Sequence, residues 1–173
     1  MAYDTLRDRV VLFGGSPADA DVFEYFAPVR SLATFVAYGA GCASSAGALQ
    51  LAALGASLPY VGEPFRTTLS PLPTGLFNIP FVVVGASDTT WAGLNLPLDL
   101  GTFGMLGCHL SASAEVVFQV VRVSSAATIT LAVPYDPVLA GQRFYLQGLV
   151  TDALANSGGL AWSNAGAATI GQR

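Results

Sequence analysis

The sequence contains no lysine and little charge of either sign. Its 173 residues include 7 basic residues, all of them arginine, and 11 acidic residues, so 10% of the chain is charged, where roughly 25% is usual. Hydrophobic residues make up 53% of the chain and the net charge is −4. A chain this apolar is not intrinsically disordered, and an acidic protein repels the phosphates of nucleic acids. We therefore exclude both classes.

The residues that most often carry catalysis are also scarce. Without lysine the chain has no side-chain amine that could form a Schiff base. His109 is the one histidine, so few side chains could transfer protons in catalysis near neutral pH. No Gly-x-Ser-x-Gly motif supports a serine nucleophile. Five acids lie in or near turns and could pair as glycosidase carboxylates, although turn chemistry explains most of them: Glu63, Asp88, Asp99, Asp136 and Asp152. We expect a protein that is not an enzyme, with no catalytic residues, no bound metal and no cofactor.

Long hydrophobic runs are absent because Pro, Gly, Asp and Arg interrupt the chain throughout. Since a membrane-spanning helix needs about 18 or more apolar residues, we expect none. Residues 1–8 have neither the basic region nor the apolar run of a signal peptide. The protein is therefore either cytosolic or has lost a leader, and the cysteines favour the second possibility.

Cys42 and Cys108 are the two cysteines, and each follows a glycine. An even pair in a lysine-free chain rich in glycine, serine and threonine is typical of an extracellular protein with a disulfide. Such a bridge would close a loop of about 67 residues, worth roughly 4 kcal/mol in the chain-entropy model. The alternative is a pair of buried thiols, and a metal site with the adjacent His109 would have an incomplete ligand set. We expect the disulfide and an extracellular or cell-surface location.

Short segments rich in Val, Ile, Phe, Thr and Tyr alternate with clusters of turn residues along the whole chain, which is typical of strands. This pattern predicts an all-β protein, an antiparallel β-sandwich of jelly-roll or Ig-like type with an N-terminal arm of two strands. Residues 48–54 are also compatible with a helical turn. The expected strands are Arg9 to Phe13, Val22 to Phe26, Ala33 to Tyr38, Leu49 to Leu54, Phe65 to Ser70, Pro80 to Gly85, Glu115 to Val123, Ala127 to Val133, Arg143 to Thr151 and Ala167 to Ile170.

Two kinds of strand are distinguishable by their hydrophobic pattern. Residues 65–69 and 128–133 alternate between apolar and polar residues, as strands with one buried face do. Residues 81–84 and 116–121 are apolar on both faces, as strands covered on both sides are. We therefore expect a further segment to cover both of the latter strands.

The N-terminal segment resembles one Kelch-type propeller repeat. The residues that carry the resemblance are Met1-Ala2-Tyr3-Asp4, Arg7-Asp8-Arg9-Val10-Val11-Leu12-Phe13-Gly14-Gly15 and Asp21-Val22-Phe23-Glu24-Tyr25, with Phe23 in place of the usual tryptophan. A blade needs four strands and a propeller several blades, and only two strands of one blade are expected here. We therefore treat residues 1–30 as a Kelch-like arm and residues 31–173 as the sandwich, the tail of a longer secreted protein or a descendant of one.

The remainder of the chain is similar to a C-terminal module of predicted secreted proteins of planctomycete-like bacteria, which often follows Kelch-type repeats. The resemblance rests on Tyr38-Gly39-Ala40-Gly41-Cys42, Leu96-Pro97-Leu98-Asp99-Leu100, Gly104-Met105-Leu106-Gly107-Cys108, Val133-Pro134-Tyr135-Asp136-Pro137, Gln147 with Asp152, and Trp162-Ser163-Asn164-Ala165-Gly166. It implies a secreted, disulfide-linked β module of uncharacterised function and supplies no catalytic residues. Leu106 stands where the module usually has proline.

The sequence is compatible with two classes of ligand. Oxygen donors on loops could hold calcium, although no repeat spacing organises them: Asp99, Asp152, Asn156 and Asn164. Five aromatic residues could form a sugar-stacking platform, although packing is the commoner role: Tyr60, Trp91, Tyr135, Tyr145 and Trp162. We expect the two tryptophans to be buried and to serve packing.

Soluble monomers protect the edges of their sheets with charge, above all with lysine, and this chain has none. We therefore predict a non-enzymatic extracellular structural protein that self-assembles by β-strand exchange into a fibre or surface layer. Its partners would be further copies of itself, as a homo-oligomer or homopolymer, and the candidate assembly residues are Val10, Val11, Leu12 and Phe13. The alternative is a glycan-binding or surface-attachment module at the C-terminus of a larger secreted protein.

Overall fold

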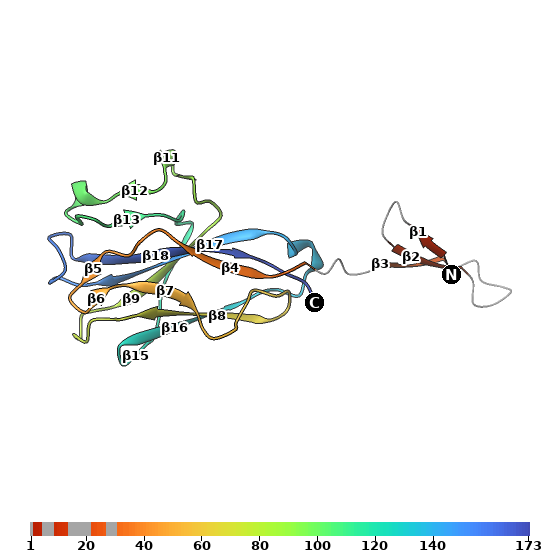
Figure 1. Ribbon diagram of the computed structural model, residues 1–173, viewed down its shortest axis with the longest axis horizontal. Helices are drawn as coiled ribbons and strands as arrows, with labels where there is room; N and C mark the ends of the chain where they lie inside the picture. The colour runs from red at the N-terminus through yellow and green to blue at the C-terminus, as the bar shows by residue number, and fades with distance from the viewer. Residues whose placement is uncertain (1, 5–8, 14–21, 27–30) are drawn as a thin grey trace.

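The chain is all-β in the computed structural model, which describes residues 2–4, 9–13, 22–26 and 31–173 (Figure 1). Within these residues the only helices are two 3-10 turns of three residues each, η1 (Gly101–Phe103) and η2 (Pro137–Leu139). None of the described helices is long or apolar enough to cross a membrane. The predicted fold class is confirmed.

Two antiparallel sheets pack against each other as a β-sandwich (Figure 1). The five-stranded sheet has the order β14 (Val116–Gln119), β9 (Pro80–Gly85), β17 (Arg143–Thr151), β18 (Leu160–Thr169) and β4 (Thr34–Tyr38). The four-stranded sheet has the order β15 (Arg122–Val123), β16 (Ala126–Ala132), β8 (Pro64–Ser70) and β7 (Gln50–Ala53). Three short ladders complete this part of the chain: β5 (Ala43–Ser44) with β6 (Gly47–Ala48), β10 (Thr90–Trp91) with β11 (Leu94–Asn95), and β12 (Leu98–Asp99) with β13 (His109–Leu110).

The inward face of the four-stranded sheet follows directly from sequence alternation. Phe65, Thr67 and Leu69 of β8 are buried, while the residues between them are partly or fully exposed. On the neighbouring strand β16, Ile129 lies opposite Thr67 and Ala127 lies opposite Leu69, and both are buried. The period-2 pattern therefore identifies the core face correctly, because successive side chains of a strand point to opposite sides.

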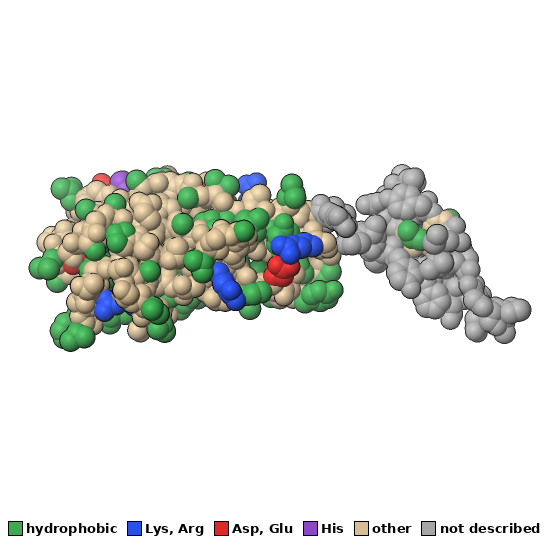
Figure 2. All heavy atoms as spheres, turned by 60° about the horizontal axis from the view of Figure 1, so that its bottom comes forward, with side chains coloured by type: hydrophobic (Ala, Val, Ile, Leu, Met, Phe, Trp, Pro, Cys, Tyr) green, Lys and Arg blue, Asp and Glu red, His purple; other side chains and the backbone are tan. Residues whose placement is uncertain are grey.

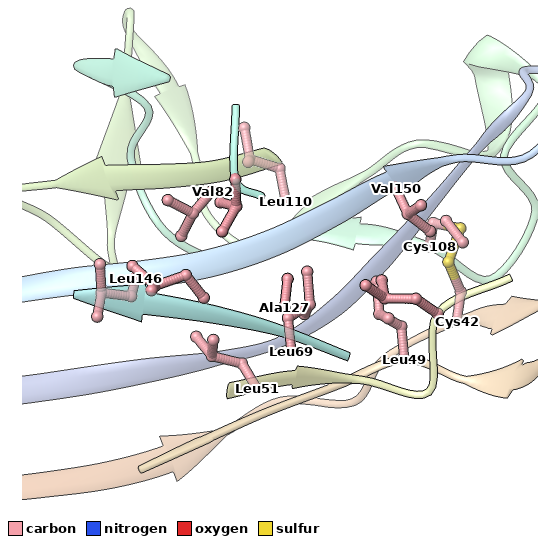
Figure 3. Packing of buried hydrophobic residues seen from close by; sticks show 14 of the residues in the cluster. Cys42, Leu49, Leu51, Leu69, Val82, Cys108, Leu110, Ala127, Leu146 and Val150 are labelled. Carbon is pink, nitrogen blue, oxygen red and sulfur yellow. A yellow bond between two sulfur atoms is a disulfide. The ribbon is translucent and has the colours of Figure 1, made fainter. Parts of the chain in front are cut away.

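The core lies between the two sheets and is made of aliphatic side chains from both. Figure 3 shows Val82 of β9 and Leu146 of β17 on one side, with Leu51 of β7 and Leu69 of β8 on the other. All four are at most 1% exposed. Burying a side chain of this size stabilises the folded state by about 1.5–3 kcal/mol, so these contacts hold the sheets together.

The prediction that two strands are covered on both faces is right for β9 and wrong for β14. Val82 and Val83 of β9 point to opposite faces and are 0% and 1% exposed. Val116 and Val117 of β14 are 55% and 54% exposed. The difference is position, since β9 has a neighbour on each side whereas β14 is the edge of its sheet.

The segment that covers the second face of the five-stranded sheet is held by Gln147, a fully buried residue of β17. The Gln147 side-chain oxygen accepts a hydrogen bond from the Ser111 backbone N–H at 2.7 Å. The Gln147 side-chain nitrogen donates to the carbonyls of His109 at 2.8 Å and of Ser163 at 2.7 Å. One side chain thus joins the segment that follows β13 to the centre of the sheet and leaves none of its own polar atoms unpaired.

The longest strand begins earlier than its sequence pattern indicates. We expect a strand from Ala167, but β18 begins at Leu160. Residues 161–166 are small or polar apart from Trp162 and lack the β-branched residues typical of strands. Tertiary pairing with β17 along eight residue positions overrides this weak propensity.

The N-terminal arm has three strands and not two, in the order β1 (Ala2–Asp4), β2 (Arg9–Phe13) and β3 (Val22–Phe26). The additional strand β1 has three residues, too few for a recognisable alternation. The described strands of the arm pair only with one another, and β2 is the central one. The predicted boundary at residue 30 falls in residues 27–30, which lie outside the described part.

The variant Gln147→Leu should test the role of the buried amide. It removes the partners of one backbone N–H and two carbonyls, so we expect the free energy of unfolding to fall by roughly 2–4 kcal/mol, measured by chemical denaturation. The exposed Gln142 is the matched control, since Gln142→Leu should change this free energy by less than about 0.5 kcal/mol. Equal effects of the two variants would contradict the assigned role of Gln147.

Candidate functional site

Cys42 and Cys108 form a disulfide, as the sequence predicts, with their Cα atoms 4.9 Å apart. The bridge joins the loop between β4 and β5 to the residue before β13 and lies beside Leu49 and Val150 in the core (Figure 3). Cys42 and Cys108 are 7% and 0% exposed. Both cysteines of the sequence lie in the described residues, and neither is free. A catalytic pair of a cysteine thiol with His109 is therefore not available.

Loss of this bridge should destabilise the sandwich. The two cysteines are 66 positions apart, and closing a loop of that length restricts the unfolded chain by about 4 kcal/mol. We expect reduction, or the double variant Cys42→Ala/Cys108→Ala, to lower the free energy of unfolding by about 2–4 kcal/mol. Uptake of an alkylating reagent by the denatured, non-reduced protein would show instead that the thiols are free.

Two of the acids that the sequence offers for catalysis or calcium binding serve local turns. The Asp136 carboxylate accepts the Val138 N–H at 3.0 Å at the start of η2. The Asp99 carboxylate accepts the Gly101 N–H at 2.9 Å. In the described part of the chain, no three His, Cys, Asp or Glu side chains lie close enough together to hold a metal ion. These carboxylates therefore stabilise turns, as their sequence context indicates.

The two asparagines among the candidate calcium ligands also bind backbone. The Asn164 side-chain oxygen accepts the Leu51 N–H at 2.8 Å, and its nitrogen donates to the Leu51 carbonyl at 3.0 Å. Asn164 thereby links β18 of one sheet to β7 of the other. The Asn156 side-chain nitrogen donates to the Leu160 carbonyl at 2.7 Å and closes the turn before β18.

Asp152 is the one buried carboxylate in the described part of the chain, at 1% exposure. It accepts hydrogen bonds from the backbone N–H groups of Ser45 at 2.6 Å and Leu154 at 3.1 Å. Burial acts to raise the pKa of Asp152, but the hydrogen bonds from Ser45, Leu154 and Ala155 together outweigh it and lower the pKa below its usual value. The charged form therefore fastens the β5–β6 loop to the turn that follows β17.

The five aromatic residues do not form a single platform. Trp91 and Trp162 are partly buried and pack against the main core cluster, which agrees with a packing role. Tyr145 is 8% exposed and makes an edge-to-face contact with Tyr38 on the covered face of the sheet, with ring centroids 6.4 Å apart. Tyr60 instead lines a cleft near the C-terminus, and the Tyr135 ring lies over Gly62.

The feature that stands out is a row of exposed valines along one side of the sandwich. Val116 and Val117 lie on β14, Val123 lies on β15, and Val121 lies between these strands. Their exposed fractions are 55%, 54%, 74% and 79%. We call this set the valine edge. Figure 2 shows how few charged side chains interrupt the apolar and neutral surface of the sandwich.

The charged residues nearest to the valine edge are engaged by neighbouring groups. Arg122 donates to the backbone carbonyls of Pro73 and Gly75 at 2.5 and 3.2 Å. The Glu115 carboxylate accepts from the Ser113 hydroxyl at 2.7 Å and from the Ala86 N–H at 3.1 Å. The Ser113 hydrogen bond is the main cause of the lowered pKa of Glu115. Residues 116–121 themselves carry no charge, so the strand lacks the charge that usually protects an edge.

The opposite edge of the same sheet is β4, and it is similarly unprotected. Val36 is 59% exposed, and its neighbours Thr34 and Ala37 are also exposed. Residues 34–38 have no charged side chain. Among the strands that the structure describes, neither edge of the five-stranded sheet has a further neighbour, and each edge has an exposed valine.

The predicted assembly residues of the arm lie on β2. This strand is paired on both sides, by β1 through Val10 and Val11 and by β3 along its whole length. Val10 and Val11 are partly buried, and the side chains of Leu12 and Phe13 lie outside the described part. A central strand has no free backbone edge, so the open edges of the sandwich are the stronger candidates for assembly.

Acid should destabilise the protein in part through Asp152. Because its pKa is lower in the folded chain than in the unfolded one, its contribution is complete above the unfolded value near 3.8 and is lost as the pH falls through the folded value. We expect unfolding free energies of Asp152→Asn to change less with pH between about 5 and 2 than those of the parent. The exposed turn variant Asp136→Asn controls for the loss of one negative charge, and an unchanged pH dependence in Asp152→Asn would refute the assignment.

Comparison with known proteins finds no relative of this chain: no protein-family model, no curated protein and no solved structure matches it. The fold is therefore established by the contacts of this chain alone. Any functional assignment has to come from its surfaces, of which the two open edges of the five-stranded sheet are the most distinctive.

Proposed function

We propose that this chain is a non-enzymatic extracellular structural protein that self-assembles through the strand edges of its sandwich into a fibre or surface layer. The observation that carries the proposal is the edge strand β14, which has one neighbour among the described strands, no charged residue and two half-exposed valines. A row of unpaired backbone groups beside apolar side chains is a template for another strand.

An extracellular location is supported by the disulfide and the composition. The Cys42–Cys108 bridge is buried in the core, and structural disulfides persist in oxidising compartments. The low charge of the chain, 10% of residues, suits a protein whose surface is covered by further copies. The resemblance to secreted bacterial modules points the same way.

A structural role is supported by the way the chain uses its reactive side chains. Asp99 and Asp136 accept hydrogen bonds from turns, and the buried Asp152 fastens two loops. Gln147 and Asn164 bind the backbone of neighbouring segments. These polar groups serve the rigidity of the sandwich, which an assembling subunit needs.

Strand exchange by the arm is a second route to the same assembly. Donation of β2 alone would break its pairing with both β1 and β3, so the arm would have to act through its outer strands. The open edges of the sandwich need no such opening, and we therefore place the main contact there.

A second candidate function, a glycan-binding or attachment module, is favoured by a cleft near the C-terminus. The cleft has a volume of about 310 Å³ and is lined by Ser31, Leu32, Tyr60, Gln172 and Arg173. The Arg173 guanidinium lies 4.2 Å from the centre of the Tyr60 ring and pairs with Glu63 at 3.2 Å. An aromatic ring with charged and amide groups suits a sugar.

Tyr135 adds an exposed ring close to this cleft. It is 89% exposed and lies over Gly62, where a Cβ atom would come within 2.6 Å of the ring. Dispersed particles that bind on a glycan array would favour this second function over self-assembly.

The variant Val117→Lys tests the proposed function. A charge at the centre of β14 should oppose pairing of that edge, so we expect assembly to weaken by roughly tenfold or more, equivalent to about 1.4 kcal/mol, measured by sedimentation velocity and electron microscopy. Val138→Lys, at a 78% exposed valine on η2 and outside the strands of both sheets, should assemble as the parent does. A parent protein that stays monomeric at all concentrations would refute self-assembly.

A further inference from the structure

Resting on the self-assembly proposed above, we infer that β14 of one copy pairs in parallel with β4 of the next, so that the five-stranded sheet runs on through the assembly. This contact covers both open edges of the sheet at once. A two-fold pairing of β14 with β14 would leave β4 of both copies open, so a second kind of contact would be needed to extend the assembly beyond a dimer.

The strand directions permit this pairing without reversing either copy. Each neighbouring pair in the order β14-β9-β17-β18-β4 is antiparallel. The first and fifth strands of the sheet therefore run in the same direction. A second copy displaced across the strands, in the same orientation, brings its β4 alongside β14 as a parallel strand.

The exposed valines of the two edges lie on the same face of the sheet. Residues paired across neighbouring strands share a face, and one such row runs from Val117 through Val83, Gln147 and Ala165 to Tyr38. Val36 is two residues before Tyr38 on β4, so it lies on that face as well. Val36 of one copy can therefore lie directly beside Val117 of the next, and each covers the other.

One hydrogen bond shows which backbone groups of β14 point away from the sheet. The Val120 N–H donates to the Pro80 carbonyl at 2.9 Å. Because such bonds alternate along an antiparallel ladder, Val116 and Phe118 also face β9. The N–H and C=O groups of Val117 and Gln119 consequently point away from the sheet.

The outward backbone groups of β4 are identified in the same way. The Ile170 N–H donates to the Gln142 carbonyl at 2.9 Å, toward the β17 side. By alternation Ala167 faces β4, and its partner Val36 faces back toward β18. The N–H and C=O groups of Phe35 and Ala37 are therefore the outward ones.

These two sets of groups fit the pattern of a parallel ladder. With Val36 beside Val117, the Val117 N–H meets the Phe35 carbonyl, and the Ala37 N–H meets the Val117 carbonyl. The Gln119 N–H then meets the Ala37 carbonyl. In a parallel pair each outward residue bonds to the residues before and after its opposite number, so side-chain faces and backbone groups match in the same register.

The contact also sets the form of the assembly. Neighbouring strands are about 4.8 Å apart and rotate by about 20–25°, so a five-stranded repeat advances about 24 Å and turns about 100–125° per copy. The expected product is a twisted filament with the strands across its axis and about three to four copies per turn.

Complementary edge variants test the inference. Val117→Lys blocks β14 and leaves β4 intact, whereas Val36→Glu blocks β4 and leaves β14 intact. We expect each variant to be monomeric alone and a 1:1 mixture to form filaments of alternating variants, measured by sedimentation velocity and electron microscopy. In the mixture the unmodified edges pair with each other, and the introduced lysine lies beside the introduced glutamate. The double variant Val36→Glu/Val117→Lys places opposite charges side by side and should recover filaments.

A backbone variant provides a second, independent measurement. Ala37→Pro removes an outward N–H, a position at which an edge strand tolerates proline, and should abolish filaments while circular dichroism stays that of the parent. Val138→Lys is again the control for a changed surface.

Three results overturn the inference, and they differ from one another. A parent protein that never assembles refutes the proposed function and this contact with it. Assembly of the parent together with dimers of Val36→Glu alone shows a two-fold β14 contact. Assembly that survives Val36→Glu, Val117→Lys and Ala37→Pro shows that another surface, such as the arm, joins the copies.

Discussion

The buried amide of Gln147 is the interaction on which the arrangement of the sandwich depends. It satisfies the backbone of Ser111, His109 and Ser163 at the centre of the five-stranded sheet. A polar group at 0% exposure is tolerated in a core only when its hydrogen bonds are made. By fixing the covering segment over β9 and β17, it makes the middle of the sheet inaccessible from both faces. The edges of the sheet are consequently where its strand backbone is open to a partner.

The disulfide and the side chain of Asn164 join other segments of the sandwich. The Cys42–Cys108 bridge joins the start of the covering segment to the loop after β4, while Asn164 ties β18 to Leu51 of the opposite sheet. These links join segments far apart in sequence, as the separation of 113 residues between Leu51 and Asn164 illustrates. These links keep the two sheets in a fixed position relative to each other, which repeated assembly requires.

The sequence predicts the strands whose side chains alternate or are uniformly apolar, and it fails where tertiary contacts decide. The strands with the predicted bounds are rich in apolar, aromatic and β-branched residues: β2, β3, β9 and β17. The start of β18 is missed because residues 161–166 are small or polar. The apolar run at 116–121 gives the same pattern whether a strand is central or at an edge, so sequence alone cannot place β14 at the edge.

Some of the functional features can likewise be predicted from the sequence, and others cannot. The disulfide follows from a count of two cysteines, whereas the role of Gln147 has only a weak signal, a lone amide within the apolar run of β17. The absence of lysine indicates unprotected edges but does not say which strands form them. Only the strand order reveals that β4 and β14 are the two edges of the same sheet, although their exposed valines Val36 and Val117 lie far apart in the sequence.

The odd number of strands in this sheet decides how copies can meet. In an antiparallel sheet with an odd number of strands, the two edges run in the same direction, so copies related by displacement form a parallel junction. The four-stranded sheet has an even number, and its edges β15 and β7 run in opposite directions, so the same displacement brings them together in antiparallel orientation. A parallel ladder is slightly weaker per residue than an antiparallel one. The open-ended contact nevertheless satisfies both edges of the longer sheet, whereas a two-fold contact satisfies one, and it is this difference that favours a filament over a closed dimer.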